Sequence, residues 1–404
     1  HHLFHLIWEA CSDMSAYVQM NFSVDMRNLL FTKEWSELRG KSFKELLTAL
    51  PRKESGNTTN AEGAPHTLES LFKDANNLFT DAKRHKIYHL PSDGNAGKGK
   101  SERFGSIINF PNFLLQVLKV CYHGRFFNLK YHEAVDAQIR LDDKALIPTF
   151  QAVLSSLGTE EEKKDFVKYF IMQLLLLRTL YDRYVIKREY VNGTESWSLK
   201  TLKYEHKTVS YVNTFSSSNK AEDAECESDK GKEIRLLEAM FHVSAPTQIY
   251  KHWLNAVLYH VLKAVHTTNP QDDSLRNRLY DLARCYMLDV YLAKDGKKHS
   301  FEEIVYRKEG MPQNHIDDID WGAINQGCNV QNFIFNFYDF ILWREKSVQH
   351  LQRKKSRQDE KLEQDEESVQ DEESVQHEKF DFTYRTSVEH FYPQKPMPGY
   401  EPLP

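Results

Sequence analysis

The sequence has few cysteines, and they are widely scattered. The chain of 404 residues contains five, and no two of them have the spacing of a zinc-binding or redox motif. An odd, dispersed set also provides no disulfide framework. We therefore expect a protein of a reducing compartment, the cytoplasm, that has neither a structural zinc site nor stabilising disulfides. The five are Cys11, Cys121, Cys226, Cys285 and Cys328.

A long apolar run is also missing. The longest, residues 169–177, is interrupted by Gln173. It is far shorter than the roughly 20 residues that a membrane-spanning helix requires. No secretory signal peptide opens the sequence. These absences predict a soluble protein without a membrane partner.

Positive charge is not in excess. Lys and Arg total 53 against 58 Asp and Glu, which gives a net charge of -5. This balance argues against a uniformly basic coat for nucleic acid, but it allows a local basic face. In residues 185–213, Lys and Arg are interleaved with Tyr and Trp, a mixture that can hold a phosphate backbone and stack on bases. We name Lys200 and Lys203 as DNA contacts, with a solvated hairpin bearing ordinary surface lysines as the alternative.

What the sequence has in quantity is helical periodicity. Segment 164–184 is apolar on almost all sides in its middle, so we expect it at the centre of the core. Residues 185–213 differ, because Asn192-Gly193 between β-type residues predicts a small hairpin. The expected fold is mainly α, a multi-helix body with one small β-hairpin. Apolar residues recur every three or four positions in 3–50, 66–83, 107–122, 142–150, 164–184, 233–241, 249–265, 276–293 and 330–344.

Stretches of biased composition divide the chain. The charged linker near the C-terminus contains a tandem repeat of DEESVQ and has too few large apolar residues to build a core. It is expected to form a solvated single helix or to stay extended. The expected parts are a helical N-terminal piece that ends a preceding domain (1–50), a linker (51–66), a helical middle domain (67–345) with an acidic low-complexity insert (216–232), the charged linker (346–379) and the start of a final domain (380–404).

Residues 94–101 match the G-x-x-x-x-G-K-[ST] pattern of a phosphate-binding loop. Such a loop requires a buried strand directly before it and a helix directly after it. The preceding 87–90 is short and partly polar, and a flexible exposed loop has the same composition. Nucleotide binding here is therefore kept only as an alternative. The fixed positions of the pattern are Gly94, Gly99, Lys100 and Ser101.

Near the C-terminus, Phe380, Phe382 and Tyr384 alternate with polar residues, as in a half-buried strand. The predicted strand leads to the adjacent Glu389 and His390. An imidazole beside an acid suits general-base chemistry, because its pKa lies near neutrality. The alternative is an ordinary surface histidine on a frayed tail.

The sequence SVEHFYPQ at 387–394 resembles the Glu-His-x-x-Pro-Gln opening of the C-terminal nuclease domain of GmrSD-type, modification-dependent restriction endonucleases. That domain belongs to the His-Me finger (HNH) superfamily. Residues 110–118, 141–146 and 197–202 resemble, in the same order, the middle region of such proteins. The resemblance implies a helical middle region followed by the first strand of a truncated ββα-metal domain. The family's Asp-Gly-Gln-Gln-Arg motif and the rest of the nuclease finger are absent, so we expect an interior fragment of a longer enzyme.

The resemblance also implies a function, metal-dependent hydrolysis of phosphodiester bonds in DNA during bacterial defence against phages. His390 would be the general base, Glu389 a metal ligand or an orienting partner, and Arg385 a phosphate contact. Mg²⁺ or another divalent ion would be the cofactor. Modified phage DNA would be the partner.

The longer enzyme would use a nucleoside triphosphate through its N-terminal domain, and the fragment alone is expected not to cut DNA. The alternative from another class is a non-catalytic helical interaction module in which Glu389-His390 is incidental. An oligomer is compatible with the sequence.

Overall fold

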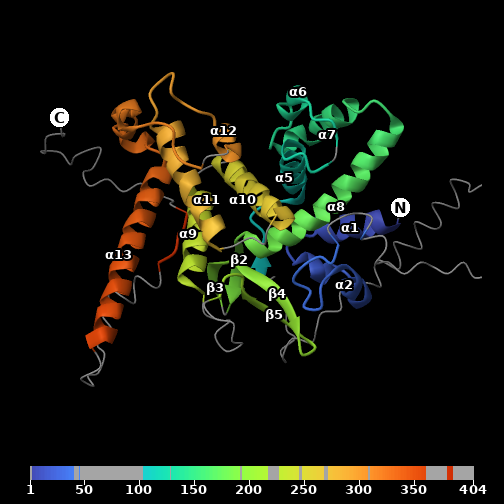
Figure 1. Ribbon diagram of the computed structural model, residues 1–404, viewed down its shortest axis with the longest axis horizontal. Helices are drawn as coiled ribbons and strands as arrows, with labels where there is room; N and C mark the ends of the chain where they lie inside the picture. The colour runs from blue at the N-terminus through green and yellow to red at the C-terminus, as the bar shows by residue number, and fades with distance from the viewer. Residues whose placement is uncertain are drawn as a thin grey trace, which may run out of the picture.

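The chain folds into a mainly helical body with small antiparallel sheets, as the sequence predicts (Figure 1). This computed structural model describes residues 2–40, 45, 103–127, 129–191, 193–216, 227–244, 248–267, 272–307, 310–360 and 380–384. The predicted linker at 51–66 and the predicted helix at 66–83 lie outside the described residues. Among the helices that are described, none combines the length and the apolar character that crossing a membrane requires.

The α-helices are α1 (His2–Ser12), α2 (Val24–Leu30), α5 (Phe110–His123), α6 (Glu133–Asp136), α7 (Leu146–Ser155), α8 (Glu160–Tyr184), α9 (Asp229–Ser244), α10 (Gln248–Thr267), α11 (Asp272–Cys285), α12 (Phe301–Tyr306) and α13 (Asn332–Glu360). A π-helical segment, η4 (Tyr286–Tyr291), follows α11. Shorter 3-10 turns are η1 (Val18–Asn21), η2 (Asp143–Ala145), η5 (Ile316–Asp318), η6 (Trp321–Ile324) and η7 (Gly327–Asn329). The strands are β1 (Phe104–Gly105), β2 (Lys187–Val191), β3 (Thr194–Ser198), β4 (Lys200–Glu205) and β5 (Thr208–Asn213).

The long helix α8 is the centre of the body, which confirms the prediction from its apolar middle. It begins with a capping box in which the Thr159 hydroxyl accepts from the amide of Glu162 and the Glu162 carboxylate accepts from the amide of Thr159. Three glutamates in its first turn also favour the helix dipole. Helices α1, α5 and α10 and strand β4 all pack on α8. One hydrophobic core therefore runs from Ile7 to Phe382.

The predicted helix over 3–50 is wrong over residues 31–40. Phe31 pairs with Leu38 in an antiparallel bridge, and Trp35 between them has a positive φ of 57°. The Trp35 ring stacks on Tyr204 at a centroid distance of 3.9 Å, and the Tyr204 amide donates to the carbonyl of Glu34. These contacts with a distant strand override the local helical pattern. The predicted domain boundaries stay predictions, although residues 2–40 share the core of the helices that follow.

The predicted hairpin is confirmed, and the described residues contain a second one. Strands β2 and β3 pair up to Val191 and Thr194, and Gly193 in their turn has a φ of 81°. Strand β1 adds a third strand to this sheet. Strands β4 and β5 form the unpredicted hairpin, whose turn residues His206 and Lys207 have φ values of 50° and 64°. Because this turn lacks the usual Asn-Gly pair, the sequence gives no signal for it.

Replacing His206 and Lys207 together by Asn and Gly should raise the free energy of unfolding by about 1 kcal/mol. Asn and Gly adopt a left-handed backbone at lower energy than His and Lys do. Denaturation in urea measures the change. Lys207→Ala is the control, because it removes the side chain without relieving the backbone and should bring no gain. A double variant no more stable than the original chain would contradict the explanation.

Several helix boundaries differ from the prediction. Helix α9 begins at Asp229, inside the segment assigned to the acidic insert, while residues 217–226 lie outside the described part. Helix α13 continues to Glu360, so the charged linker is helical up to that residue. The expected helix over 276–293 ends in the π-helical η4. Residues 380–384 form no strand pairing within the described chain, so the predicted strand is absent there.

Candidate functional site

The residues predicted to carry chemistry lie outside the described residues. This holds for the candidate base His390, its neighbour Glu389 and the phosphate contact Arg385. It holds also for the phosphate-loop positions Gly94, Gly99, Lys100 and Ser101. Within the described ranges, no group of three or more His, Cys, Asp or Glu side chains could hold a metal ion.

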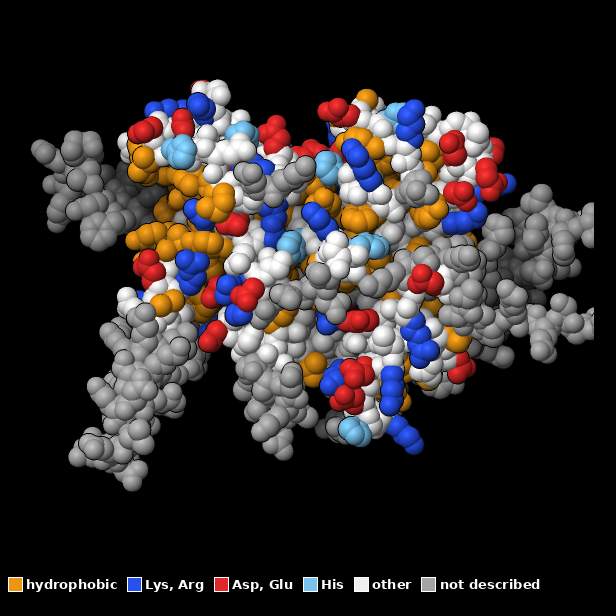
Figure 2. Space-filling model, viewed as in Figure 1, with side chains coloured by type: hydrophobic (Ala, Val, Ile, Leu, Met, Phe, Trp, Pro, Cys, Tyr) orange, Lys and Arg blue, Asp and Glu red, His pale blue; other side chains and the backbone are white. Residues whose placement is uncertain are grey.

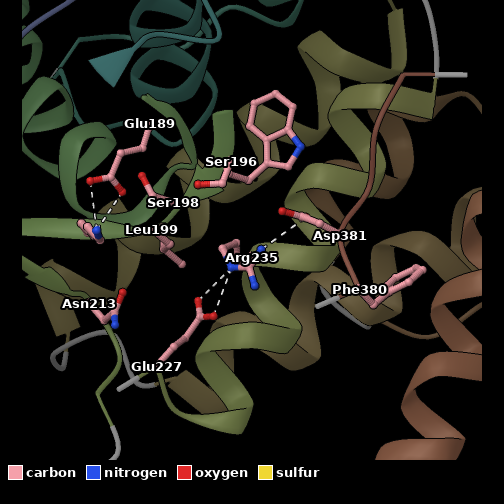
Figure 3. Close-up of a pocket in the computed structure, with 11 residues that line it drawn as sticks. Glu189, Ser196, Ser198, Leu199, Asn213, Glu227, Arg235, Phe380 and Asp381 are labelled. Atoms are coloured by element: carbon pink, nitrogen blue, oxygen red, sulfur yellow. Dashed lines mark hydrogen bonds and ion pairs between the residues drawn. The ribbon is translucent and has the colours of Figure 1, made fainter. Parts of the chain in front are cut away.

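The described chain does form a polar pocket, of about 320 Å³, between β2–β4, the start of α9 and residues 380 and 381 (Figure 3). Its charged walls contain three carboxylates and two cations. Ser198 also lines it, with a buried hydroxyl that has no hydrogen-bond partner among the described residues. The charged residues are Glu189, Glu227 and Asp381, with Lys200 and Arg235.

The cations of this pocket are already neutralised. Lys200 Nζ lies 2.7 Å from Glu189 Oε2, and Arg103 Nη2 lies 2.7 Å from Glu189 Oε1. Burial alone would raise the pKa of Glu189, but Lys200 and Arg103 hold it below its ordinary value. Arg235 Nε donates to both oxygens of Glu227 at 3.1 Å. The pocket is a set of ion pairs rather than a basic site.

The predicted DNA face on the hairpins is paired in the same way. Lys203 Nζ lies 2.9 Å from Glu205, and Arg188 Nε lies 3.2 Å from Glu195. Among the interleaved aromatic residues, Tyr204 is stacked on Trp35. Glu205 is close to Lys203 on the same strand, but the sequence did not reveal that Arg188 would pair with Glu195 on the neighbouring strand or that Tyr204 would stack on the distant Trp35. The structure thus brings Lys200 to the pocket and leaves Lys203 on the outer hairpin, each with a carboxylate beside it.

Residues 380–384, which we call the docked segment, pack beside the pocket, and the first two of them line it. Phe382 is only 4% exposed, and its ring meets the ring of Phe380 at 5.0 Å. Phe380 stacks on Trp343 of α13. The indole nitrogen of Trp197 donates to the carbonyl of Phe382 at 2.7 Å. Of the three residues predicted to face the core, Phe382 is buried and Phe380 is partly buried, but Tyr384 is 47% exposed, so the predicted alternation is confirmed only in part.

Polar contacts hold both ends of the docked segment. Asp381 Oδ1 lies 3.2 Å from Arg235 Nη1, and burial raises the pKa of this carboxyl despite the arginine. The Tyr384 hydroxyl and His242 Nε2 share a hydrogen bond of 2.7 Å. Burial, with the nearby Arg188, lowers the pKa of His242 to about 4. A neutral imidazole therefore meets the tyrosine at physiological pH.

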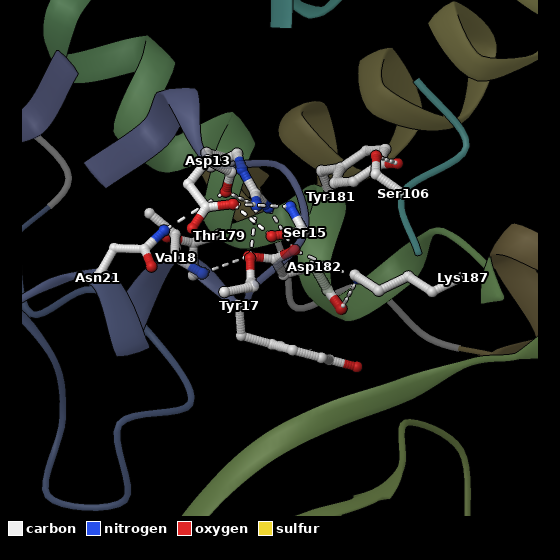
Figure 4. A network of polar contacts seen from close by, with 12 residues as sticks. Asp13, Ser15, Tyr17, Val18, Asn21, Ser106, Thr179, Tyr181, Asp182 and Lys187 are labelled. Carbon is white, nitrogen blue, oxygen red and sulfur yellow. Dashed lines mark hydrogen bonds and ion pairs between the residues drawn. The ribbon is translucent and has the colours of Figure 1, made fainter. Parts of the chain in front are cut away.

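A buried ionic network lies at the other end of β2 (Figure 4). Asp182 on α8 forms ion pairs with Arg178 and with Lys187, whose Nζ lies 3.2 Å from Oδ1. It also accepts from the amide of Val18 at 2.7 Å. Burial lowers the pKa of Lys187 to about 8. Perturbed groups often mark active sites, but these side chains are buried and tie the N-terminal segment to α8, so we interpret the network as structural.

A second polar cluster joins α5, α6 and α12. His123 Nδ1 lies 2.7 Å from Asp136 Oδ2, and Lys119 Nζ lies 3.3 Å from the other oxygen of Asp136. The His123 ring stacks on Tyr306 of α12 at 3.7 Å. A carboxylate that orients an imidazole occurs in catalytic triads, yet here the imidazole is packed against a ring. Sequence reasoning missed this pair, because no motif links residues thirteen positions apart.

Comparison with known proteins identifies no relative. No protein family matches the sequence, and neither a curated protein nor a solved structure resembles this chain at a significant level.

Proposed function

We propose that this chain is the helical body of a metal-dependent DNA endonuclease of the modification-dependent restriction class. The observation that supports it best is the docked segment. The chain that leads to Glu389-His390 is fixed to α9, α13 and the β2–β3 hairpin. The body thereby has the means to position the proposed general base.

Chain length limits where the base can act. Six residues lead from Tyr384 to His390 and span at most about 20 Å when fully extended. Because Tyr384 is hydrogen-bonded to His242, the scissile phosphate would meet the body on the side of α9 that carries His242. The helical body would then be a rigid support for the catalytic residues that follow it in the sequence.

In this proposal His390 accepts the proton of the attacking water, and Glu389 orients the imidazole or binds the divalent ion. Mg²⁺ would stabilise the charge that develops on the phosphate. The substrate is DNA, modified phage DNA in particular. The reaction would take place in the cytoplasm, which agrees with the buried free thiols of Cys11, Cys121 and Cys285.

Plasmid cleavage tests this proposal. The natural protein that contains this sequence is incubated with modified and unmodified plasmid in Mg²⁺ or Mn²⁺. His390→Ala should lower the cleavage rate about 100-fold or more, because a general base typically contributes that much. His5→Ala is the matched control, since His5 is an exposed histidine that also lies beside a glutamate. Equal cleavage by the His390 variant, or no cleavage under any of these conditions, would reject the nuclease.

The ion pairs of the hairpins favour a second candidate, a non-catalytic helical interaction module. Both predicted DNA-contact lysines have carboxylate partners within 3 Å. If the chain serves only to bind protein partners, fluorescence anisotropy should detect no DNA binding even at low salt. Salt-dependent binding would instead favour the nuclease.

A further inference from the structure

Four of the five residues in the docked segment each contact a different side chain of the body. Phe380 stacks on a ring, and Asp381 forms an ion pair. The carbonyl of Phe382 and the hydroxyl of Tyr384 take part in hydrogen bonds. Thr383, between them, is exposed. The body side chains that make these contacts, which we call the segment site, are Trp197, Arg235, His242 and Trp343.

The segment site is fixed by contacts that do not involve the docked segment. Its residues belong to β3, α9 and α13, which all precede the segment in the chain (Figure 1). Arg235 Nε donates to both oxygens of Glu227 at 3.1 Å. The rings of Trp197 and His242 meet at a centroid distance of 5.1 Å. We therefore expect the site to keep its shape when the segment leaves, which lowers the cost of binding another occupant.

The docked segment is held mainly through its side chains. It pairs with no strand of the described chain. Phe382 is almost fully buried, and Phe380 is partly buried beside it. The guanidinium of Arg188 lies over the ring of Tyr384, 5.5 Å from its centre. Since side chains give specificity when a protein recognises a short linear peptide, another chain with the same residues in the same order would find the same contacts.

Charge selects the residue at the second position of the segment. Burial raises the pKa of Asp381, whereas the nearby Arg235 and Lys232 act in the opposite direction. A lysine in place of this aspartate would put three cations around one remaining carboxylate, Glu227, and like charges side by side are unfavourable. Hydrophobic side chains also gather on the left of the molecule, where α13 lies, next to Lys and Arg side chains (Figure 2). This side of the molecule therefore offers both kinds of contact that an aromatic and acidic peptide uses.

We propose that the segment site recognises linear peptides of the pattern Phe-Asp-Phe-x-Tyr, and that a partner protein carrying this pattern exchanges with the docked segment. The docked segment is then a ligand attached to its own receptor. Covalent attachment gives such a ligand an effective concentration of about 1 mM. A partner displaces it by binding more tightly than the segment does, or by exceeding that concentration.

This recognition does not depend on the nuclease proposal. It would have one consequence for that proposal, because a partner in the segment site would release the chain that leads to His390. Peptide binding is measured without DNA, so failure of either proposal leaves the other one standing.

Fluorescence anisotropy with a labelled peptide of residues 379–385, KFDFTYR, tests the proposal on the full chain. In the original chain the docked segment competes with this peptide. Phe382→Ala weakens the competitor, so the apparent dissociation constant of the peptide should fall at least about tenfold, because apparent affinity follows the fraction of vacant sites. In the variant it should lie below about 1 mM, the effective concentration at which the attached segment stays docked. A substitution that merely damaged the fold would weaken binding instead.

Two altered peptides define what is recognised. The reordered peptide KTFYFDR has the same composition and should not bind. A peptide with Lys in place of Asp should bind at least about tenfold more weakly, because it meets like charges. Equal binding of the reordered peptide would overturn the proposal.

A change in the segment site itself completes the test. Combined with Phe382→Ala, Trp197→Phe should weaken peptide binding about three- to tenfold, since it removes one hydrogen-bond donor and keeps an aromatic ring. Should Phe382→Ala fail to fold, Tyr384→Ala weakens the competitor at a residue that is 47% exposed. Equal affinity of the original chain and the vacated variant, or no saturable binding to the variant below about 1 mM, would overturn the proposal.

Discussion

Replacing Asp182 by alanine is expected to lower the free energy of unfolding by about 3–5 kcal/mol, the usual cost of removing one partner from a buried ion pair. Arg178 and Lys187 are both almost fully buried, and each loses its carboxylate partner. The amide of Val18 loses its acceptor as well. The uncompensated charges, rather than the lost attraction, dominate the cost, because no water reaches them in the folded state.

Urea denaturation measures this loss, and Asp165→Ala is the matched control. Asp165 is on the same helix and lies 2.7 Å from Lys168, but these two side chains are 46% and 41% exposed rather than buried. Exposed pairs contribute about 0–1 kcal/mol, so the control should lose little stability. Similar losses for the two variants would show that the buried network is not a special source of stability.

The same variant should loosen the N-terminal segment before the rest of the body. Arg178 Nη2 donates to the carbonyls of Asp13 and Ala16, at 3.1 Å and 2.7 Å. Arg178 is held in place by its ion pair with Asp182. Hydrogen exchange around η1 should therefore rise more than exchange in α10. This local effect would identify the network as the connection between residues 2–40 and α8.

The sequence predicted those elements whose pattern is local. The α5, α8 and α10 segments repeat apolar residues along one helix, and the Asn-Gly turn fixes one hairpin. Elements that depend on distant partners were missed. Trp35 leaves the helical path because Tyr204, far along the chain, offers a ring to stack on. The β4–β5 hairpin was missed because its left-handed turn residues are His206 and Lys207.

The candidate site was predicted to the same extent: its local pattern was found, and its contacts with distant residues were missed. The alternation of Phe380, Phe382 and Tyr384 predicted a half-buried segment, and Phe382 is buried, whereas Tyr384 is exposed. It could not predict that Trp197 and Arg235 would hold this segment, because they lie far away in the sequence. Nor could the lysine-rich pattern of 185–213 reveal that Lys200 and Arg188 would pair with carboxylates on other strands. Local periodicity specifies which face is buried, whereas charge pairing depends on the tertiary fold.

Replacing Phe382 by alanine should release the docked segment without unfolding the body. A buried Phe→Ala change costs about 3–5 kcal/mol. The docked segment is held by side-chain contacts and forms no strand pairing, so it can detach locally. The detached population should therefore rise roughly 100-fold or more, while the melting temperature of the body changes little. Limited digestion by chymotrypsin at Phe380 and Tyr384 measures the detached population.

Thr383→Ala is the control for this release, because Thr383 is the exposed neighbour in the same segment. Its digestion rate should match that of the original chain. An unchanged rate for the Phe382 variant would mean that the other contacts hold the segment without Phe382.

Phe382→Ala in the natural protein then separates docking of the segment from catalysis. If digestion is faster but plasmid cleavage is unchanged, the body does not position the base. If both change together while Thr383→Ala changes neither, docking of this segment is what brings His390 to the DNA.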